Sequence, residues 1–334
     1  MTSSRYRLPA EWEPHRATWI AWPHNREDWP GKFAPIPWIW VEIVRALHRS
    51  ERVSILTVDP VSPRRMLARA GVDLSRVEFH AFPTDRVWTR DYGPMFAFRG
   101  GRLVIQDWRF NGWGKYPNWK RDRRVAARAA RSLNLPLVGP GITLEGGAID
   151  GNGQGLFLTT EECLLSDVQQ RNPGVSRSRL QGVLRRYLGA REILWLGRGI
   201  AGDDTHGHVD DCARFVDART VVACVERDRS DPNYEPLRDN LRRLRARRDL
   251  EVVTIPMPAP LYFNRQRVPA SYANFYIANK AVLVPTFHDP NDRLALNILA
   301  HLFPTRQVIG IHSVDLIWGL GSLHCLTQQE PVVG

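Results

Sequence analysis

Long apolar runs are missing from this 334-residue sequence. No stretch approaches the ~18 apolar residues that a membrane-spanning helix needs, and the first residues lack the charged segment and apolar core of a signal peptide. Hydrophobic residues make up 43% of the chain, with 12 tryptophans among them, which supplies ample material for a core. We therefore expect a globular, cytoplasmic protein with no membrane partner.

Cysteine is also scarce, with four widely spaced residues and no C-x-x-C pair. In a cytosolic chain, this pattern argues against a disulfide framework and against a zinc ribbon. We interpret Cys163, Cys212 and Cys224 as small hydrophobic residues in or next to core strands. Cys325 differs, because it follows a Gly/Ser turn and a histidine and precedes the polar run "TQQ".

Lysine is rare, yet the net charge is +11 and the isoelectric point is about 10.0, so the excess is arginine. The arginines concentrate in residues 120–133 and 237–250, where Leu, Val or Ala recur on one helical face and Arg on the other. We interpret both stretches as solvated helix faces. A nucleic-acid partner is disfavoured despite the high isoelectric point, because no aromatic residues are interleaved with the charge and no binding motif accompanies it.

Short apolar runs bounded by Gly, Pro or Asp alternate with amphipathic stretches along the whole chain, which predicts an α/β fold. The runs 94–100 and 102–108 flank Gly100-Gly101, a sequence typical of a hairpin turn. No linker or low-complexity segment marks a boundary, so residues 1–334 are predicted to form one domain. The predicted helices are 40–50, 62–71, 122–133, 175–189, 235–248 and 292–303.

Polar residues gather in "GDDTHGHVDDCARF", Gly202 to Phe215. If this segment enters a strand, His206, His208 and Asp210 share one face. Two histidines near carboxylates are compatible with a metal site, with a structural histidine, or with an imidazole oriented by an aspartate for acid/base work. No H-E-x-x-H motif supplies the remaining ligands of a metal.

Three further segments add a thiol and carboxylates: "VWTRDYGP" (Val87 to Pro94), "TLEGGAIDGNG" (Thr143 to Gly153) and "GSLHCLTQQEP" (Gly321 to Pro331). A cysteine with a distant histidine is the sequence pattern of a thiol nucleophile with a proton shuttle. His324 is a weaker candidate for the base, since in a strand it would point away from Cys325. Several carboxylates around a thiolate suit a cationic substrate, and a planar guanidinium fits them well.

Together with "EWEPHRATWIAWP" (Glu11 to Pro23) and "ASYANFYIANKAVLVPTFHDPNDRLAL" (Ala270 to Leu296), these segments resemble the agmatine deiminases. Those enzymes belong to the bacterial-type peptidylarginine deiminase group of guanidino-group modifying enzymes. The resemblance runs from about Glu11 to Pro331. It implies a pentein α/β propeller, in which five ββαβ-type modules surround a pseudo-fivefold axis. It also implies hydrolysis of a small cationic guanidine, with agmatine giving N-carbamoylputrescine and ammonia. No metal or organic cofactor is expected, and the resemblance implies a homo-oligomer, which we expect to be a dimer.

The resemblance also assigns roles to residues of this chain. Cys325 matches the nucleophile, His208 the general acid/base, and Asp91 and Asp210 the pair that holds the guanidinium. Trp88 matches a tryptophan beside the substrate, while Glu145 and Asp204 match acidic positions of the pocket. The chain departs from the family pattern twice: "GGGNIHC" is "GLGSLHC" here, so Leu320 replaces a glycine, and "DET" is Asp203-Asp204-Thr205.

Three alternatives stay open at this point. A deiminase acting on arginine residues of peptides, or on another guanidine, would use the same chemistry. A metal-dependent hydrolase would use His206, His208 and Asp210. An arginine-rich nucleic-acid-binding protein would use the same scaffold without catalysis.

Overall fold

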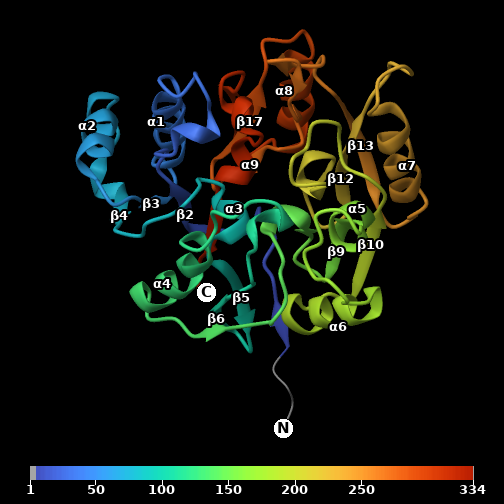
Figure 1. The fold of residues 1–334 in the computed structure, drawn as a ribbon, viewed down its shortest axis with the longest axis horizontal. Helices are drawn as coiled ribbons and strands as arrows, with labels where there is room; N and C mark the ends of the chain where they lie inside the picture. The colour runs from blue at the N-terminus through green and yellow to red at the C-terminus, as the bar shows by residue number, and fades with distance from the viewer. Residues whose placement is uncertain (1–4, 334) are drawn as a thin grey trace.

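The chain folds into short strands flanked by helices (Figure 1), in a computed structural model that describes residues 5–333. The α-helices are α1 (Ile36–Leu47), α2 (Val61–Arg69), α3 (Thr89–Tyr92), α4 (Val125–Ser132), α5 (Glu161–Leu165), α6 (Arg177–Leu188), α7 (Tyr234–Arg245), α8 (Asn291–Leu302) and α9 (Leu323–Leu326). Seven short 3-10 helices are also present in these residues, of which η5 (Gly146–Ala148) and η6 (Val209–Asp211) matter below. No helix among residues 5–333 is long and apolar enough to cross a bilayer.

The strands form six small sheets within the described residues. Their bounds are β1 (Tyr6–Arg7), β2 (His15–Ala21), β3 (Arg52–Leu56), β4 (Val77–His80), β5 (Met95–Arg99), β6 (Arg102–Gln106), β7 (Leu137–Val138), β8 (Asp150–Gly151), β9 (Leu156–Thr160), β10 (Glu192–Leu196), β11 (Ala213–Phe215), β12 (Thr220–Val225), β13 (Glu251–Pro256), β14 (Tyr262–Phe263), β15 (Gln266–Arg267), β16 (Tyr276–Ile277), β17 (Ala281–Thr286), β18 (Gln307–His312) and β19 (Gln328–Pro331). Strands β14 and β15 pair only with each other in a hairpin.

One pairing pattern recurs in the five larger sheets. An antiparallel pair is followed by a helical crossover to a parallel strand: β5–β6 then α4 and β7, β8–β9 then α5, α6 and β10, β11–β12 then α7 and β13, and β16–β17 then α8 and β18. In the fifth sheet, β19 pairs antiparallel with β2, and α1 leads to the parallel strand β3. The last and first parts of the chain are thereby joined in one sheet.

The sequence-predicted helices are confirmed because each buries apolar residues along one side, and some also have sequence signals at their ends. Helix α6 begins after Ser176, whose hydroxyl accepts a hydrogen bond from the backbone N–H of Arg179, and ends at Gly189 with a φ of 75°. In the arginine-rich helix α7, Leu237 and Leu244 are buried while most arginines face outward. The Gly100-Gly101 hairpin is also confirmed, with Arg99 opposite Arg102 across the turn.

Short elements were missed by the sequence pattern. Helices α3, α5 and α9 have four or five residues each, too few to show a helical period. The expectation that residues 206–210 enter a strand is wrong: His206 has a φ of 62°, and the chain then forms η6. In Figure 1, α3 and α9 lie next to each other in the middle of the molecule, while α2, α4, α6 and α7 lie at its rim.

Candidate active site

Four short segments bring the predicted catalytic residues together at the centre of the fold. Asp91 lies in α3, Cys325 in α9, and His208 and Asp210 lie at the start and within η6. Each of the four side chains is buried. These elements contact one another directly or through η5, so residues more than 200 positions apart in the sequence share one small volume.

The imidazole of His208 lies between carboxylates. Its Nδ1 is 3.9 Å from Asp91 Oδ1 and 4.0 Å from Asp210 Oδ1, and its Nε2 is 3.8 Å from Glu145 Oε2. Asp91 is held by hydrogen bonds from the Trp113 indole N–H (2.9 Å) and the Gly147 backbone N–H (3.0 Å). Asp210 Oδ1 and both ring nitrogens of His208 are buried without a hydrogen-bond partner among the described residues.

Gly147 is required by this close packing. A Cβ atom at this position would lie 2.5 Å from His208 Nδ1 and 3.0 Å from the nearest carboxylate oxygens of Asp91 and Asp210. No real Cβ approaches other atoms that closely, so a side chain here would push the imidazole away from both carboxylates. The glycines of "EGGAID" thus serve the site through close backbone approach.

The thiol of Cys325 has two polar neighbours. The amide Nδ2 of Asn274 donates to Sγ at 3.2 Å, and Asp210 Oδ2 lies 3.9 Å from the same atom. The Asn274 Oδ1 atom also accepts hydrogen bonds from the backbone N–H groups of His324 and Cys325, so one buried side chain positions both the start of α9 and the thiol. Asn274 was not singled out from the sequence, although it lies in the quoted segment "ASYANFYIANK".

His324 contributes through a buried chain of charged groups. Cys325 lies in a helix, so the strand geometry used to disfavour His324 as the base does not apply. Both ring nitrogens of His324 are nevertheless occupied by carboxylates, so His324 is not placed to transfer protons. Its Nδ1 pairs with Asp210 Oδ2 at 2.6 Å and its Nε2 with Glu11 Oε2 at 2.8 Å. Glu11 in turn forms ion pairs with Arg90 (3.1 Å) and Arg214 (3.0 Å). This network fixes the orientation of the Asp210 carboxylate.

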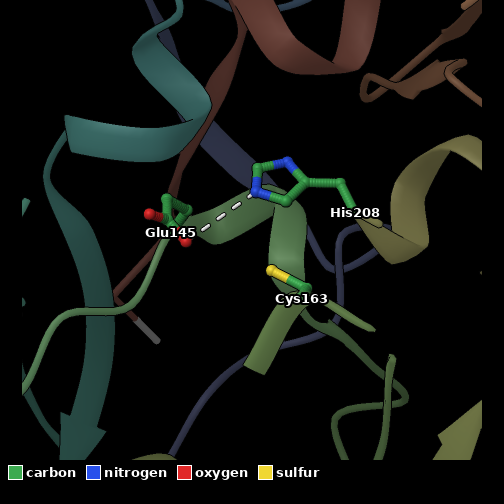
Figure 2. A group of neighbouring side chains, drawn as sticks. All are labelled: Glu145, Cys163 and His208. Carbon is green, nitrogen blue, oxygen red and sulfur yellow. Dashed lines mark ion pairs between the residues drawn. The ribbon is translucent and has the colours of Figure 1, made fainter. Parts of the chain in front are cut away.

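Cys163 is buried next to strand β9, as the sequence predicts, and it also lies beside the site. It belongs to α5, whose Thr160 cap follows strand β9, and its Sγ lies near His208 and Glu145 (Figure 2). Glu145 Oε1 accepts a hydrogen bond from Arg171 Nε at 3.1 Å, and both side chains are fully buried. Neither Cys163 nor Arg171 carried a sequence signal that distinguished it from a packing residue.

A pocket opens from this centre to the surface. Asp91 and Cys325 line its inner end, and the aromatic rings of Trp88, Trp113 and Trp318 line its wall. Trp88 packs against Gly321, where a Cβ atom would lie 2.6 Å from the indole ring. The pocket also contains the residues at which the sequence departs from the family pattern, Leu320 and Asp204.

Asp204 lies toward the outer part of the pocket and is already paired. Its Oδ1 forms an ion pair with Lys115, and its Oδ2 accepts a hydrogen bond from Tyr116 at 2.6 Å. His206 does not join the site, since its Nε2 contacts Ser166 instead. The ligand set His206, His208 and Asp210 of a metal-dependent hydrolase is therefore not assembled.

Burial and charge shift the proton affinities of the site in different directions. Burial raises the pKa of the Cys325 thiol well above its ordinary value, and the carboxylates of Asp210, Asp211 and Asp91 raise it further. Burial also raises the pKa of Asp91 to about 6, although the nearby His208 opposes this shift. For His208, burial disfavours the charged form, but Asp91, Cys163 and Glu145 outweigh burial and raise its pKa. Burial disfavours ionised Glu145 too, yet Arg171 and His208 lower its pKa to about 2. The site thus favours a neutral thiol beside a cationic imidazole.

Comparison with known sequences identifies the family. The sequence profile of the Porphyromonas-type peptidyl-arginine deiminases matches residues 7–331. This chain belongs to that family. Among its curated members, the agmatine deiminase of Stutzerimonas stutzeri is 35% identical, with 98% of this chain and 95% of that protein covered. The agmatine deiminase of Pseudomonas aeruginosa is 34% identical with the same coverage.

Solved structures of the family share the mixed α/β fold with its several small sheets. The agmatine deiminase of Enterococcus faecalis superposes with a TM-score of 0.89 at 30% identity, covering 99% of this chain and 98% of that one. A cysteine-to-serine variant of the C. jejuni agmatine deiminase with substrate bound superposes with a TM-score of 0.90 at 30% identity, covering 97% and 96% of the two chains.

Proposed function

We propose that this chain hydrolyses agmatine to N-carbamoylputrescine and ammonia through a covalent intermediate on Cys325. The observation that carries the proposal is the arrangement at the inner end of the pocket. The Cys325 thiol and the Asp91 carboxylate line the pocket there, and the His208 imidazole and the Asp210 carboxylate lie behind them at 3.9–4.0 Å. The chain is related over almost its whole length to agmatine deiminases.

In this proposal, the guanidinium docks between Asp91 and Asp210. Asp210 Oδ1 is buried without a partner, and a buried acceptor in this state is costly unless a ligand donor reaches it. A guanidinium has five N–H donors in a planar fork and stays charged, so it can satisfy both carboxylates at once. Its positive charge also opposes the carboxylates that hold the Cys325 thiol protonated, and therefore favours the thiolate.

The reaction then proceeds in two halves. As the guanidinium docks, the Cys325 thiol loses its proton to solvent, and the thiolate attacks the central guanidine carbon. The resulting tetrahedral adduct collapses as the imidazolium of His208 protonates the departing nitrogen. Ammonia leaves, and an S-alkylthiouronium stays on the enzyme. The now neutral imidazole deprotonates a water molecule, which attacks the same carbon, and the ureido product leaves as the thiolate is restored. His208 is both acid and base, which fits its position beside Asp91 and Asp210.

The charge of the pocket favours agmatine over free arginine. Four carboxyl groups line it, against one guanidinium, that of Arg86. These carboxyl groups are Glu27, Asp28, Asp91 and Asp204. Agmatine has a second cationic group at its far end, whereas arginine has an ammonium group and a carboxylate there, and the carboxylate would meet like charges. A net acidic lining therefore attracts the dicationic agmatine more strongly than free arginine, whose net charge is only +1.

The test is a colorimetric ureido assay on agmatine, free arginine and arginine-containing peptides. We expect kcat/KM for agmatine to exceed that for free arginine by about two orders of magnitude or more, because placing like charges together costs several kcal/mol. Faster turnover of peptides than of agmatine would instead support the peptidyl-arginine alternative. Absence of any ureido product would overturn the proposed function.

We further infer that the five larger sheets are five ββαβ-type modules around a pseudo-fivefold axis, in a single catalytic domain over residues 1–334. The recurring order of antiparallel pair, crossover helix and parallel strand supports the modules. A hydrophobic cluster that includes residues from Trp19 to Leu326 supports the single domain. A cytoplasmic location and a homodimer are proposed on family resemblance, to be checked by cell fractionation and by light scattering.

A further inference from the structure

A group of three potential metal ligands lies on the side of His208 that faces away from Asp91 and Asp210. Figure 2 shows it: the imidazole of His208, the thiol of Cys163 from α5 and the carboxylate of Glu145 point toward one another. One ligand atom from each residue lies within 4.8 Å of the other two, and all three side chains are buried.

Two of the three ligand atoms form an ion pair with each other but no hydrogen bond. His208 Nε2 and Glu145 Oε2 are 3.8 Å apart, and neither forms a hydrogen bond with any residue in the described range 5–333. Buried polar atoms nearly always form a hydrogen bond, so two such atoms that face each other beside a thiol indicate a ligand that bridges them.

The donor set matches one class of cation. A thiolate, an imidazole and a carboxylate are the ligands that Zn²⁺ prefers, whereas Mg²⁺ and Ca²⁺ prefer oxygen alone. Tetrahedral bonds of about 2.0–2.3 Å would place these ligand atoms roughly 3.3–3.6 Å apart. The 3.8 Å separation of His208 Nε2 and Glu145 Oε2 is close to that range. Cys163 Sγ lies within 4.8 Å of both atoms, so it would need to move by at most about 1 Å to reach bonding geometry.

Neighbouring groups orient two of the ligands. Arg171 donates to Glu145 Oε1, which leaves Oε2 turned toward the imidazole. The His208 ring has its Nδ1 edge on Asp91 and Asp210, which leaves Nε2 toward the group. Such supporting contacts are typical of metal sites, because they fix the ligand atoms before the cation arrives.

We propose that Cys163, His208 and Glu145 form a Zn²⁺ site that, when filled, inhibits the enzyme reversibly. Binding forms bonds from Zn²⁺ to Cys163 Sγ, His208 Nε2 and Glu145 Oε2, and two protons leave to solvent, one from the Cys163 thiol and one from Nε2 of the His208 imidazolium. With Nε2 bound to the metal and a proton on Nδ1, the imidazole has no free lone pair and cannot act as a base. The proposed Zn²⁺ binding is inferred from the contacts described above, whereas inhibition by Zn²⁺ also depends on the proposed function.

The depth of the site predicts how inhibition develops. Its three side chains are buried, and Asp91, at the inner end of the pocket, separates the pocket from His208. Zn²⁺ should therefore act slowly, over a time course rather than at once. Agmatine in the pocket should slow the onset, and a chelator should restore activity.

The decisive experiment is titration of the full-length protein with Co²⁺, a spectroscopic substitute for Zn²⁺, followed by competition with Zn²⁺. A thiolate-to-cobalt charge-transfer band is expected in the unaltered protein. Cys163→Ala should lose the band, and its Zn²⁺ affinity should fall by more than the roughly 10–100-fold that loss of a supporting contact costs. Cys224→Ala is the matched control, since this buried cysteine contacts Ser271 instead of His208 and should leave the band unchanged.

A further variant separates this site from the nucleophile. Cys325→Ala should retain the band, because Cys325 is not among the three ligands. Loss of the band in Cys325→Ala with retention in Cys163→Ala would overturn the proposal, as would absence of any band. If Cys163→Ala lowers the melting temperature, Cys163→Ser replaces it as the test variant. Serine is similar in size to cysteine but a poorer metal ligand, so Cys163→Ser should also lose the charge-transfer band. If agmatine is not hydrolysed at all, the proposed function fails, yet the band still reports on the site.

Discussion

Lowering the pH through the shifted pKa of Asp91 should weaken substrate capture. Burial raises this pKa to about 6, with further upward shifts from the charges of Asp210 and Glu145, while His208 and the hydrogen bond from Trp113 oppose them. Above this value Asp91 is a carboxylate and attracts the guanidinium. Below it the side chain is neutral, so kcat/KM for agmatine should fall as the pH drops through about 6.

The size of the effect follows from the titration of a single group. At pH 7 about nine tenths of Asp91 is ionised, and at pH 5 about one tenth, so kcat/KM should fall by roughly tenfold between the two. An unperturbed aspartate, with a pKa of about 3.9, would show almost no change over this range. The ureido assay at low agmatine concentration, in buffers of constant ionic strength, measures the ratio directly.

Two variants identify the group that titrates. Trp113→Phe removes the indole N–H that donates to Asp91 Oδ2 at 2.9 Å, so the decline should move to higher pH. Asp28 also lines the pocket with a pKa raised by burial to about 6, so Asp28→Asn is the control and should leave the decline in place. A profile that is flat down to pH 5, or a decline that disappears in Asp28→Asn, would refute the assignment to Asp91.

Three substitutions test other parts of the site. Cys325→Ala should fold normally and lose kcat by on the order of 10⁴-fold or more, measured by ammonia release and circular dichroism, whereas near-normal release would exclude the nucleophile role. Gly147→Ala places a Cβ 2.5 Å from His208 Nδ1 and should lower kcat/KM by about 100-fold, while Gly182→Ala, with nothing within 4 Å, should not. Glu11→Gln leaves two buried guanidinium groups poorly compensated and should lower the free energy of unfolding by about 3–5 kcal/mol in urea denaturation. The exposed ion pair of Glu13 with Arg7 is the control, since Glu13→Gln should lower the free energy of unfolding by less than about 1 kcal/mol. Equal losses of unfolding free energy in Glu11→Gln and Glu13→Gln would contradict the burial argument.

The longer elements were predictable because their signals are local. Helix α6 has a serine cap and a terminal glycine, and the arginine-rich helix α7 repeats leucine at helical spacing. The motif residues Cys325, His208, Asp91 and Asp210 were also predictable, since each stands in a polar, glycine-rich segment that packing alone does not require. By contrast, α3, α5 and α9 are too short to show a period, and their helical geometry comes from the contacts that surround them.

The sequence by itself determined the α/β class, the main helices and the polar segments that carry the four central residues, because periodicity, caps and local composition depend on near neighbours. Only the tertiary structure decided which other groups meet them. Glu11 reaches His324 across 313 positions, and Asn274 reaches Cys325 across 51. Cys163, an ordinary hydrophobic residue in its local sequence, lies beside the imidazole of His208. A contact of this kind depends on how separate sheets pack together, which no local pattern of residues records.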